Sequence, residues 1–519
     1  SWPDRKRKLY NEKMGGCKTT KKPDTEIKQT AELLELSWPD RKRKLYNEKM
    51  GGCKMKRKLI ASLMAATMVA GMLTGCGGGS SADDSATTDD TKQEETAEAG
   101  TDDAASGEDA DVNEDGTVNN PEAVKVDENK LVFWSLFSGG DGEYMDKIIS
   151  DYNATDPDKQ VQSIMLVWAD YYTKLQTAVA AGKGPDIGIS HASKLPELVD
   201  QGVVEPLNDY LDEMGVDLSS MYADNSIDSV TFDGDIYAIP LDTHAEILYY
   251  NTDILEKAGV ELNADGQLDI SSKDDFFAIL DKCKAVMGDG ESVISLTNNG
   301  DDPYRVWWAT YFQMGGTPLV NDDGTEVTMD KDIAVKAAEF VKSLYDEGYV
   351  AEGIDDHQKF FQSGKAAFYI GGTWGTGALE QTDGLNFAAQ PFPQLFDNDS
   401  CWADSHTLIL PVNPDRTEEE TKAAVEFMVA VSKDGGTTWA GSGQIPANKE
   451  VLESQEYKDM PYRSSYKAAL DTAVLPSKNP HFYAMKAGMI DSLNTLWSDA
   501  ADASGAIDSL YGELESNLE

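Results

Sequence analysis

The sequence is short of basic residues and has no long apolar run. Its 519 residues include 45 Lys and Arg against 92 Asp and Glu, which gives a formal net charge of -47. Nucleic-acid binding is not expected, because contacts to phosphate need Lys and Arg. No apolar stretch reaches the roughly 20 residues that a membrane-spanning helix requires. The composition therefore disfavours a nucleic-acid-binding protein and a protein built on spanning helices.

Cysteine is also scarce, with five residues in the whole chain. Cys17 and Cys53 belong to a basic leader and Cys76 to an export signal, so only Cys283 and Cys401 remain for the folded part. These two could pair in an oxidising compartment. Their spacing does not suggest a disulfide scaffold. The fold must therefore rest on an ordinary hydrophobic core.

Residues 55–76 have the pattern of a bacterial export signal, MKRKLIASLMAATMVAGMLTGC. Three basic residues precede an apolar run from Leu59 to Leu73, which fits a secretory signal. The closing Leu73-Thr-Gly-Cys76 resembles the lipobox of bacterial lipoproteins. That resemblance implies cleavage before Cys76, lipidation of its thiol, and a mature chain tethered to the outer face of the membrane. The alternative is an ordinary signal peptide with an incidental cysteine.

The 54 residues before this signal contain the same 18-residue segment twice, at 1–18 and 37–54. Two polar copies cannot stack into a repeat fold. An export signal should also begin at the N-terminus. Gly51-Gly52 can be encoded by a ribosome-binding sequence placed suitably before the codon of Met55. We therefore expect translation to begin at Met55 and residues 1–54 to be mistranslated upstream DNA. A basic arm that binds membrane or nucleic acid is the alternative.

Residues 76–130 are expected to form a lipid-anchored, acidic, disordered linker, because they contain almost no large apolar residues before Val124. One pattern lies within it. Asp111, Asn113, Asp115 and Glu122 match the spacing of a calcium-binding loop, with Gly116 at the turn. Acidic linkers match this pattern by chance, and Pro121 lies inside it. Ca²⁺ in the linker is the single cofactor that the sequence suggests, with a chance match as the alternative.

From Leu131 onward, short apolar strands alternate with helical stretches. This β-α-β-α-β order predicts a parallel sheet with helices on both faces. Nearly 390 residues exceed one compact core, so two domains are expected. The predicted elements are strands at 131–134, 161–167, 186–190 and 366–370, helices at 143–153 and 170–181, and a helix capped by Asp330 and ended by Gly348.

Several segments, in order along the chain, resemble the extracellular solute-binding proteins of carbohydrate ABC transporters, the maltose-binding-like family 1. Each segment is weak alone, but the ordered set together with a lipobox is specific. The segments are Val132-Phe-Trp134 with Ser138-Gly-Gly140, Leu175 to Gly182 with Gly184-Pro-Asp-Ile187, Tyr237-Ala-Ile-Pro240 with Leu248-Tyr-Tyr-Asn251, Asn321-Asp-Asp-Gly324, Gly371-Gly-Thr-Trp374 and Gly443-Gln-Ile-Pro446.

The resemblance implies a two-lobed α/β fold of the periplasmic-binding-protein type (type II), with the ligand in a cleft between the lobes. Lobe one would span 131–241 with a return segment near 403–445. Lobe two would span 246–398 with C-terminal helices at about 446–519. The implied function is capture of a carbohydrate, with an oligosaccharide favoured by the number of aromatic residues, and delivery to the transmembrane subunits of an ABC permease. The protein would act as a monomer and catalyse no reaction.

Aromatic side chains at the predicted cleft are the first candidates for ligand contact, because flat rings cover the apolar face of a sugar. Core packing is the alternative for each of them, since aromatics also dominate cores. The candidates are Trp134, Phe137, Trp168, Tyr172, Tyr304, Trp307, Trp374 and Trp402.

Polar candidates follow the predicted strands and crossings, where they would bond sugar hydroxyls. A histidine bonded to the hinge backbone, or an aspartate bracing the hinge, is an equally plausible structural role. No cluster of Arg or Lys falls at the predicted loops, which disfavours an anionic ligand. The polar candidates are His191, Asp242, His244, Asp404 and His406.

Two other functions remain open at the level of the sequence. Asp242 and Asp404 could form the acid/base pair of a glycoside hydrolase, although nothing in the sequence sets their separation. Alternatively, the protein could present its ligand to a membrane sensor instead of a permease. The sequence does not separate import from sensing.

Overall fold

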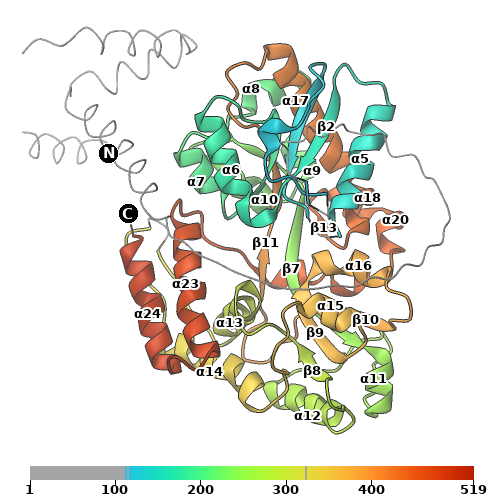
Figure 1. The fold of residues 1–519 in the computed structure, drawn as a ribbon, viewed down its shortest axis with the longest axis vertical. Coiled ribbons are helices and arrows are strands. Elements are labelled where there is room, and N and C mark those ends of the chain that lie inside the picture. The colour runs from blue at the N-terminus through green and yellow to red at the C-terminus, as the bar shows by residue number, and fades with distance from the viewer. Residues whose placement is uncertain (1–111, 114–115, 139, 322–323, 519) are drawn as a thin grey trace, which may run out of the picture. The chain divides into compact units, whose positions relative to one another are not determined.

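The computed structural model describes residues 112–113, 116–138, 140–321 and 324–518. The leader, the export signal with Cys76, and Asp111 and Asp115 of the calcium-loop pattern lie outside these residues. The described chain forms two α/β lobes, one above the other in Figure 1. None of its helices is both long and apolar enough to cross a membrane.

Lobe one contains a five-stranded sheet in the order β2-β1-β3-β12-β6. β1 pairs in parallel with β2 and β3, as the alternating pattern predicts, but β12 runs antiparallel to both β3 and β6. The predicted parallel pairing therefore holds for the first three strands, and the sheet is mixed because β12 enters the lobe from the opposite direction. The main elements are β1 (Lys130–Ser135), α5 (Gly142–Ala154), β2 (Gln160–Met165), α6 (Trp168–Ala180), β3 (Ile187–His191), α7 (Leu195–Asp200), α8 (Asn208–Met214), α9 (Leu218–Met221), α10 (Asp224–Ser229), β4 (Thr231–Phe232), β5 (Asp235–Ile236), β6 (Ala238–Pro240), β12 (His406–Ile409), α17 (Glu418–Lys433) and α18 (Gly436–Gly441).

Lobe two is built around β7, which is the centre of its sheet. β7 pairs with β9, β10, β11 and β13, and nine of its ten residues are buried. The apolar residues Ala245 and Ile247 to Tyr250 of this strand belong to the core of lobe two. The main elements are β7 (Asp242–Asn251), α11 (Thr252–Lys257), α12 (Lys273–Lys284), β8 (Ser292–Ser295), α13 (Asp301–Gln313), α14 (Lys331–Asp346), α15 (His357–Gln362), β9 (Ala366–Gly372), η2 (Thr373–Gly375), α16 (Thr376–Glu380), β10 (Phe387–Pro391), β11 (Cys401–Asp404), β13 (Ile445–Pro446), α19 (Lys449–Glu453), α20 (Gln455–Lys458), α21 (Arg463–Tyr466), α22 (Ala469–Thr472), β14 (Ala473–Val474), α23 (Phe482–Trp497) and α24 (Ala503–Ser516).

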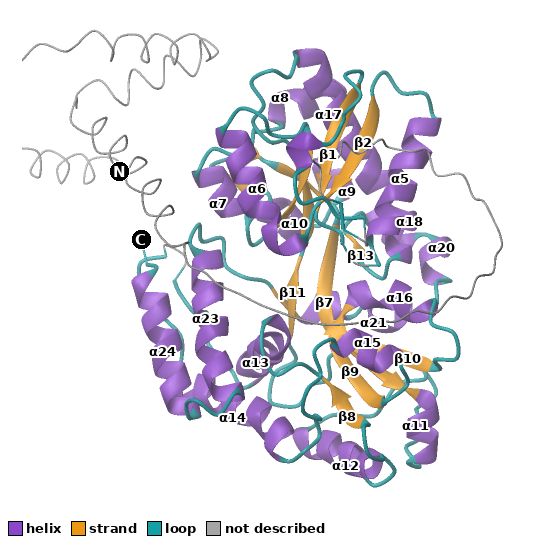
Figure 2. Ribbon diagram, viewed as in Figure 1, coloured by secondary structure: helices purple, strands orange, loops and turns teal. Residues whose placement is uncertain are grey.

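Three segments cross between the lobes. β6 continues into β7, β11 continues into β12, and β13 leads from α18 into the C-terminal helices. β7 and β11 run side by side between the two lobes in Figure 2, and they pair antiparallel. Each lobe has its own hydrophobic core on its side of these crossings.

Local sequence signals explain where several helices begin and end. Asp330 accepts a hydrogen bond from the backbone N–H of Ile333 and so caps α14. Thr417 and Glu420 form a reciprocal capping box at the start of α17. Gly182 follows α6 with a φ of +71°, and Gly348 follows α14 with a φ of +66°. Both glycines take the left-handed conformation that commonly ends a helix.

The last part of the expected linker is not disordered. Val118 forms a parallel bridge with Leu166 and is buried in the core of lobe one. Thr117 and Pro121 are also buried. A valine and a proline supply enough apolar surface for this segment to pack beside β2, which the charged composition of the surrounding sequence conceals.

The two cysteines in the folded part do not form a disulfide. Cys283 and Cys401 are free and buried in the core of lobe two. Burial raises the pKa of Cys283 to about 11 and that of Cys401 to about 12. Both side chains therefore act as small apolar groups and not as reactive thiols.

Two tryptophans in contrasting environments test the assignment of core and surface. Trp307→Ala should strongly lower the melting temperature, because truncating a fully buried aromatic costs about 3–5 kcal/mol. Trp168 is 41% exposed, so Trp168→Ala should change the free energy of unfolding by no more than about 0.5 kcal/mol. Thermal unfolding followed by circular dichroism checks both. Equal losses in the two variants would contradict the packing described here.

Candidate ligand-binding site

A cavity of about 280 Å³ lies between the lobes, and both lobes contribute to its wall. Lobe one supplies the segment after β1, the start of α6 and the end of β3. Lobe two supplies the start of α13, the turn after β9 and one side of α23. The lining residues are Leu136, Ser138, Asp141, Trp168, His191, His244, Asp301, Asp302, Arg305, Trp374, Trp402, Asp404, His406, Gln444, Tyr483 and Lys486.

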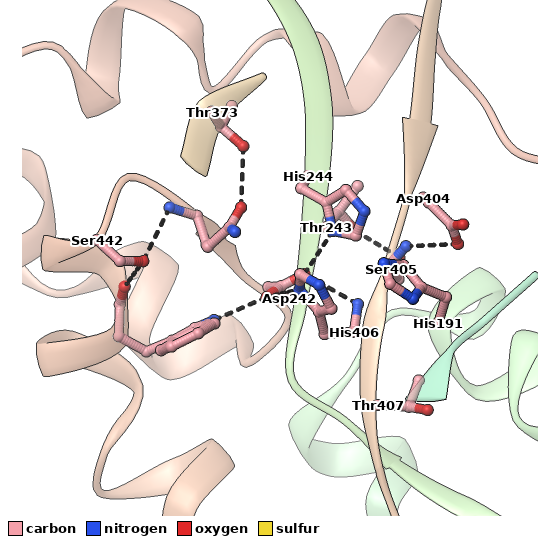
Figure 3. Close-up of polar contacts among 12 residues, drawn as sticks. His191, Asp242, Thr243, His244, Thr373, Asp404, Ser405, His406, Thr407 and Ser442 are labelled. Atoms are coloured by element: carbon pink, nitrogen blue, oxygen red, sulfur yellow. Dashed lines mark hydrogen bonds and ion pairs between the residues drawn. The ribbon is translucent and has the colours of Figure 1, made fainter. Parts of the chain in front are cut away.

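Three histidines meet where the crossing strands reach the cavity (Figure 3). His406 in β12 lies opposite His191 in β3, and His244 in β7 lies opposite Asp404 in β11. Both crossings carry the same tripeptide pattern, Asp242-Thr-His244 and Asp404-Ser-His406. Because side chains alternate along a strand, each Asp and His share one face.

Asp242 is the centre of this cluster. Its carboxylate accepts hydrogen bonds from His244 Nδ1 at 3.2 Å, from His406 Nδ1 at 2.9 Å and from the His406 backbone N–H at 3.0 Å. It also accepts one from Trp439 Nε1 at 2.7 Å. A carboxylate offers about four acceptor positions. All of them are occupied, so Asp242 has none left for a ligand.

His191 and Asp404, the remaining polar residues of the cluster, are positioned by hydrogen bonds to residues of lobe one. Tyr172 Oη lies 2.7 Å from His191 Nδ1 and accepts a hydrogen bond from the His191 backbone N–H at 2.8 Å. Asp404 accepts hydrogen bonds from the backbone N–H and the hydroxyl of Ser193. The histidine side chains are therefore oriented by neighbours that reach them from behind the cavity wall.

Burial and crowding set the charge states of the rings. Burial lowers the pKa of His191 and His244, and the adjacent His406 lowers both further. Burial also acts to lower the pKa of His406, but Asp242 raises it above the ordinary value. The pKa of Asp242 would rise on burial alone, and its two histidine partners hold it well below the usual range instead. The cluster therefore holds few positive charges.

Arg305 lies between two tryptophans of the cavity wall. Its guanidinium carbon is 4.9 Å from the ring centre of Trp374 and 4.6 Å from that of Trp402. Such cation–π contacts contribute about 2 kcal/mol when the cation is desolvated. Arg305 also pairs with Asp302 at 3.2 Å and lies 3.8 Å from Asp301. The arginine thus fixes both rings and the acidic start of α13 in one arrangement.

The charges around the cavity are mostly negative and are partly neutralised within the wall. Lys486 pairs with Asp301, so both cationic side chains of the wall are already engaged with carboxylates. Four carboxylates line the cavity against these two cations. Behind the wall, burial raises the pKa of Glu246 to about 8, which Arg305 only partly opposes. The site is therefore poorly suited to an anion.

Gly443 allows the third crossing to approach the Trp374 turn. Its φ is +111°, and a Cβ there would lie 2.1 Å from the carbonyl oxygen of Thr373. Only glycine fits this close approach. The next residue, Gln444, hydrogen-bonds Thr373 through its Oε1 at 3.0 Å, and its Nε2 has no partner among the described residues. A ligand acceptor could therefore bond Gln444 Nε2.

The structure brings seven of the candidate ligand-contact residues to the cavity wall. Others lie in the two cores, which corrects the expectation for them. Trp134 is buried in lobe one, and Tyr304 and Trp307 are fully buried in lobe two. The Trp307 indole N–H bonds the backbone of Ala334. The seven at the wall are Trp168, His191, His244, Trp374, Trp402, Asp404 and His406.

Three further candidates support the wall from behind instead of lining it. Phe137 packs with its ring 4.9 Å from His406 and 4.7 Å from Trp439. Tyr172 orients His191, and Asp242 orients His244 and His406. The prediction that these side chains contact the ligand is corrected to a structural role, because each is already engaged with a wall residue.

The sequence reasoning missed Asp301, Arg305, Tyr483 and Lys486, which line the cavity. In α13, the helical period was the signal that could have identified Asp301 and Arg305. Asp301 and Arg305 are four residues apart and share the cavity face, whereas Tyr304, Trp307 and Tyr311 share the buried face. Lys486 and Tyr483 come from a C-terminal helix, and no local signal places that helix at the cavity.

The calcium-loop pattern is only partly described. Asn113 bonds Thr117 and Asn119 through its side chain, at 2.8 and 3.0 Å. Glu122 forms an ion pair with Lys183 at 2.7 Å. Ca²⁺ binding at this pattern stays a prediction.

The chain matches the family model described as bacterial extracellular solute-binding protein over residues 147–464, more than half of its length. It therefore belongs to the bacterial extracellular solute-binding proteins, which confirms the resemblance seen in the sequence. A maltotriose-binding protein of Pyrococcus abyssi is 21% identical over 404 residues, covering 75% of this chain and 83% of that protein.

Solved structures confirm the two-lobed fold. An ABC substrate-binding protein from Listeria monocytogenes, in complex with cycloalternan, has a TM-score of 0.65 at 19% identity, covering 75% of this chain and 99% of that one. UgpB from Mycobacterium tuberculosis, in complex with glycerophosphocholine, has a TM-score of 0.66 at 19% identity. The match covers 75% of this chain and 98% of UgpB. At this identity the likeness concerns the fold.

The environment of Arg305 yields a testable difference between buried and exposed ion pairs. Arg305→Met removes the guanidinium that lies beside Asp301, Asp302 and the buried Glu246, and it should destabilise the protein by about 3–5 kcal/mol. The matched variant Lys359→Met removes a cation whose side chain is 81% exposed, and it should cost about 0–1 kcal/mol. Chemical denaturation of both variants measures the contrast. A loss for Arg305→Met as small as that for Lys359→Met would refute the role given to Arg305.

Proposed function

We propose that this protein is the extracytoplasmic solute-binding component of an ABC importer and that it captures a carbohydrate between its lobes. Membership of the solute-binding family supports the class of function, and a relative named for maltotriose binding supports the class of solute. The observation that carries the proposal at this site is the exposed indole of Trp168 on the cavity wall.

Trp168 is 41% exposed, whereas Trp374 and Trp402 have Arg305 over their rings. Among the described residues it is the single exposed large aromatic side chain. An indole left open at a cavity loses contact with water when a ligand covers it, and this burial is favourable. The flat ring suits the C–H face of a sugar, so Trp168 is the platform that we assign to the solute.

Polar groups next to this platform suit a neutral polyhydroxylated solute. Gln444 Nε2 is a buried donor that no other described residue accepts from, and Asp404 supplies a carboxylate acceptor. The cations Arg305 and Lys486 are already paired with aspartates, which disfavours a phosphorylated or otherwise anionic solute. Hydroxyl groups, which both donate and accept, match such a wall.

The volume of the site favours a compact group inside the cavity. At about 280 Å³ it lies near the lower limit of small-molecule sites, which range over about 300–1,000 Å³. An oligosaccharide would therefore place one end in the cavity and extend along its open side. The crossing segments give the lobes a hinge on which to close over the solute.

We assign no catalysis to the site. A hydrolase would need one free carboxylic acid and one free carboxylate flanking the sugar. Asp242 does not line the cavity and its acceptor positions are filled, so it cannot pair with Asp404 in this role. The chain would bind the solute unchanged and pass it to the permease, whose partner subunits hydrolyse ATP.

A thermal-shift screen tests the solute. The purified protein should melt at a higher temperature with one series of mono- or oligosaccharides, because a ligand that binds the folded state stabilises it by mass action. Trp168→Ala should lose most of this shift, since the platform is gone. The matched variant Tyr511→Ala removes an aromatic ring from α24, outside the cavity wall, and should keep the shift.

A flat response of folded protein across the glycans would overturn the carbohydrate proposal. Retention of the full shift in Trp168→Ala would overturn the role of that residue alone.

The lipid anchor is a separate proposal, supported by the lipobox-like Leu73-Thr-Gly-Cys76. Expression in a bacterium with labelled palmitate should label the wild-type protein and fractionate it with membranes. Cys76→Ser should abolish the label and release the protein, whereas Cys283→Ser, at a buried thiol, should change neither. Labelling that survives Cys76→Ser would show that the anchor is wrong. Intact mass of the same material decides whether residues 1–54 are present.

A further inference from the structure

We propose that His191, His244 and His406 bind a divalent transition-metal ion of the Zn²⁺ class at the crossing strands. One ring nitrogen from each histidine lies within 4.8 Å of the other two. All three side chains are buried and all three line the cavity. This inference goes beyond solute binding, and it holds whether or not the solute is a carbohydrate.

The rings are spaced as they would be around one ion. Their centres are 4.2 Å apart for His244 and His406, 4.8 Å for His191 and His406, and 5.5 Å for His191 and His244. Tetrahedral Zn²⁺ with Zn–N bonds of about 2 Å places imidazole centres about 5 Å apart. The observed distances bracket this value, so the rings need only small rotations to share an ion.

Each ring is held at Nδ1 by a partner behind it. Asp242 holds the Nδ1 atoms of His244 and His406, and Tyr172 Oη lies 2.7 Å from that of His191. No hydrogen bond joins the Nε2 atom of any of the three to another residue that the structure describes. A carboxylate on the far nitrogen of a histidine is the usual outer partner at a metal site, because it orients the ring and raises its basicity.

The outer partners are themselves anchored. Trp439 Nε1 donates to Asp242 at 2.7 Å, and the backbone N–H of His406 donates to the same carboxylate at 3.0 Å. The His191 backbone N–H donates to Tyr172 Oη at 2.8 Å. Rings merely packed together would not require this support. A preorganised outer shell of this kind is what a metal site needs.

Charge also favours an ion at this position. Three imidazolium rings in contact would repel one another, and a bound dication would take the place of their ring protons. The same cavity wall carries four carboxylates, Asp141, Asp301, Asp302 and Asp404, which make the surroundings attractive to a cation. Among the residues that the structure describes, the cluster holds these three ligands, which leaves a coordination position of a tetrahedral ion open toward the cavity. Water or an oxygen of the solute would fill it.

The placement of the three ligands links ion binding to the hinge. His191 and His406 lie on strands of lobe one, and His244 lies on the strand that crosses to lobe two. Nitrogens around tetrahedral Zn²⁺ are about 3.3 Å apart, closer than the 4.8 Å limit seen here. A small change of lobe angle or ring rotation would close this difference, so the ion and the solute would favour the same closed state.

Titration of the full chain with Co²⁺ alone, without a histidine tag and without sugar, tests the proposal. Wild-type protein should bind one equivalent and develop the visible absorption bands of tetrahedral Co²⁺ with nitrogen ligands. His244→Gln should weaken binding more than the roughly 10–100-fold expected for losing only an outer partner. His481→Ala, which removes an exposed histidine outside the cluster, should bind like wild type.

Melting temperatures of all variants show whether each is folded, and His191→Gln repeats the test at a second ligand. The proposal is overturned if wild-type protein shows no such bands, if the bands are those of thiolate coordination, or if both glutamine variants keep wild-type affinity. Since no glycan is present, failure here leaves the carbohydrate screen to be judged by itself.

Discussion

The carboxylate of Asp242 is the interaction on which the arrangement of the two lobes depends. Asp242 is the first residue of β7, and its backbone lies opposite Pro446 in β13. Its carboxylate accepts hydrogen bonds from His406 at the start of β12. All three crossings therefore meet at one buried residue. An ionised carboxylate is costly to bury unless its acceptor positions are filled. Here they are, and Trp439 from α18 supplies the last of them.

A consequence of this arrangement is that the wall of the cavity is stiff on one side and adjustable on the other. The histidines are set by Asp242 and Tyr172, and the two indoles of lobe two are set by Arg305. Trp168, by contrast, stands exposed on lobe one. Closure of the lobes would bring the exposed ring toward a preformed surface. Little free energy would then be lost to ordering the site when the ligand binds.

Much of the fold was predictable because its signals are local. Helix α14 was expected between Asp330 and Gly348, and the structure shows the Asp330 cap and a helix that ends just before that glycine. The first strands and helices lie within two residues of their expected bounds. The antiparallel β12 was not foreseen, because direction in a sheet depends on where the chain comes from. The packed segment around Val118 was hidden by its acidic neighbours.

The site was only half predictable for the same reason. His191, His244 and His406 could be placed at the cavity because each follows or begins a strand or a crossing. Trp307 and Arg305 stand two positions apart on one helix, yet one is fully buried and the other lies on the wall. Aromatic character alone did not decide which side of α13 faced the cavity. The helical period would have separated them, but only with knowledge of what α13 packs against.

The class of fold, the order of its elements and the positions of the crossings could all be read from the amino-acid sequence. These follow from periodicity, caps and short motifs, which act over a few residues. The tertiary structure alone decided that Asp242 is a saturated support, that Lys486 from a C-terminal helix reaches the cavity, and that three histidines share one space. Such facts join residues that are tens to hundreds of positions apart. They depend on packing between elements, which no local pattern encodes.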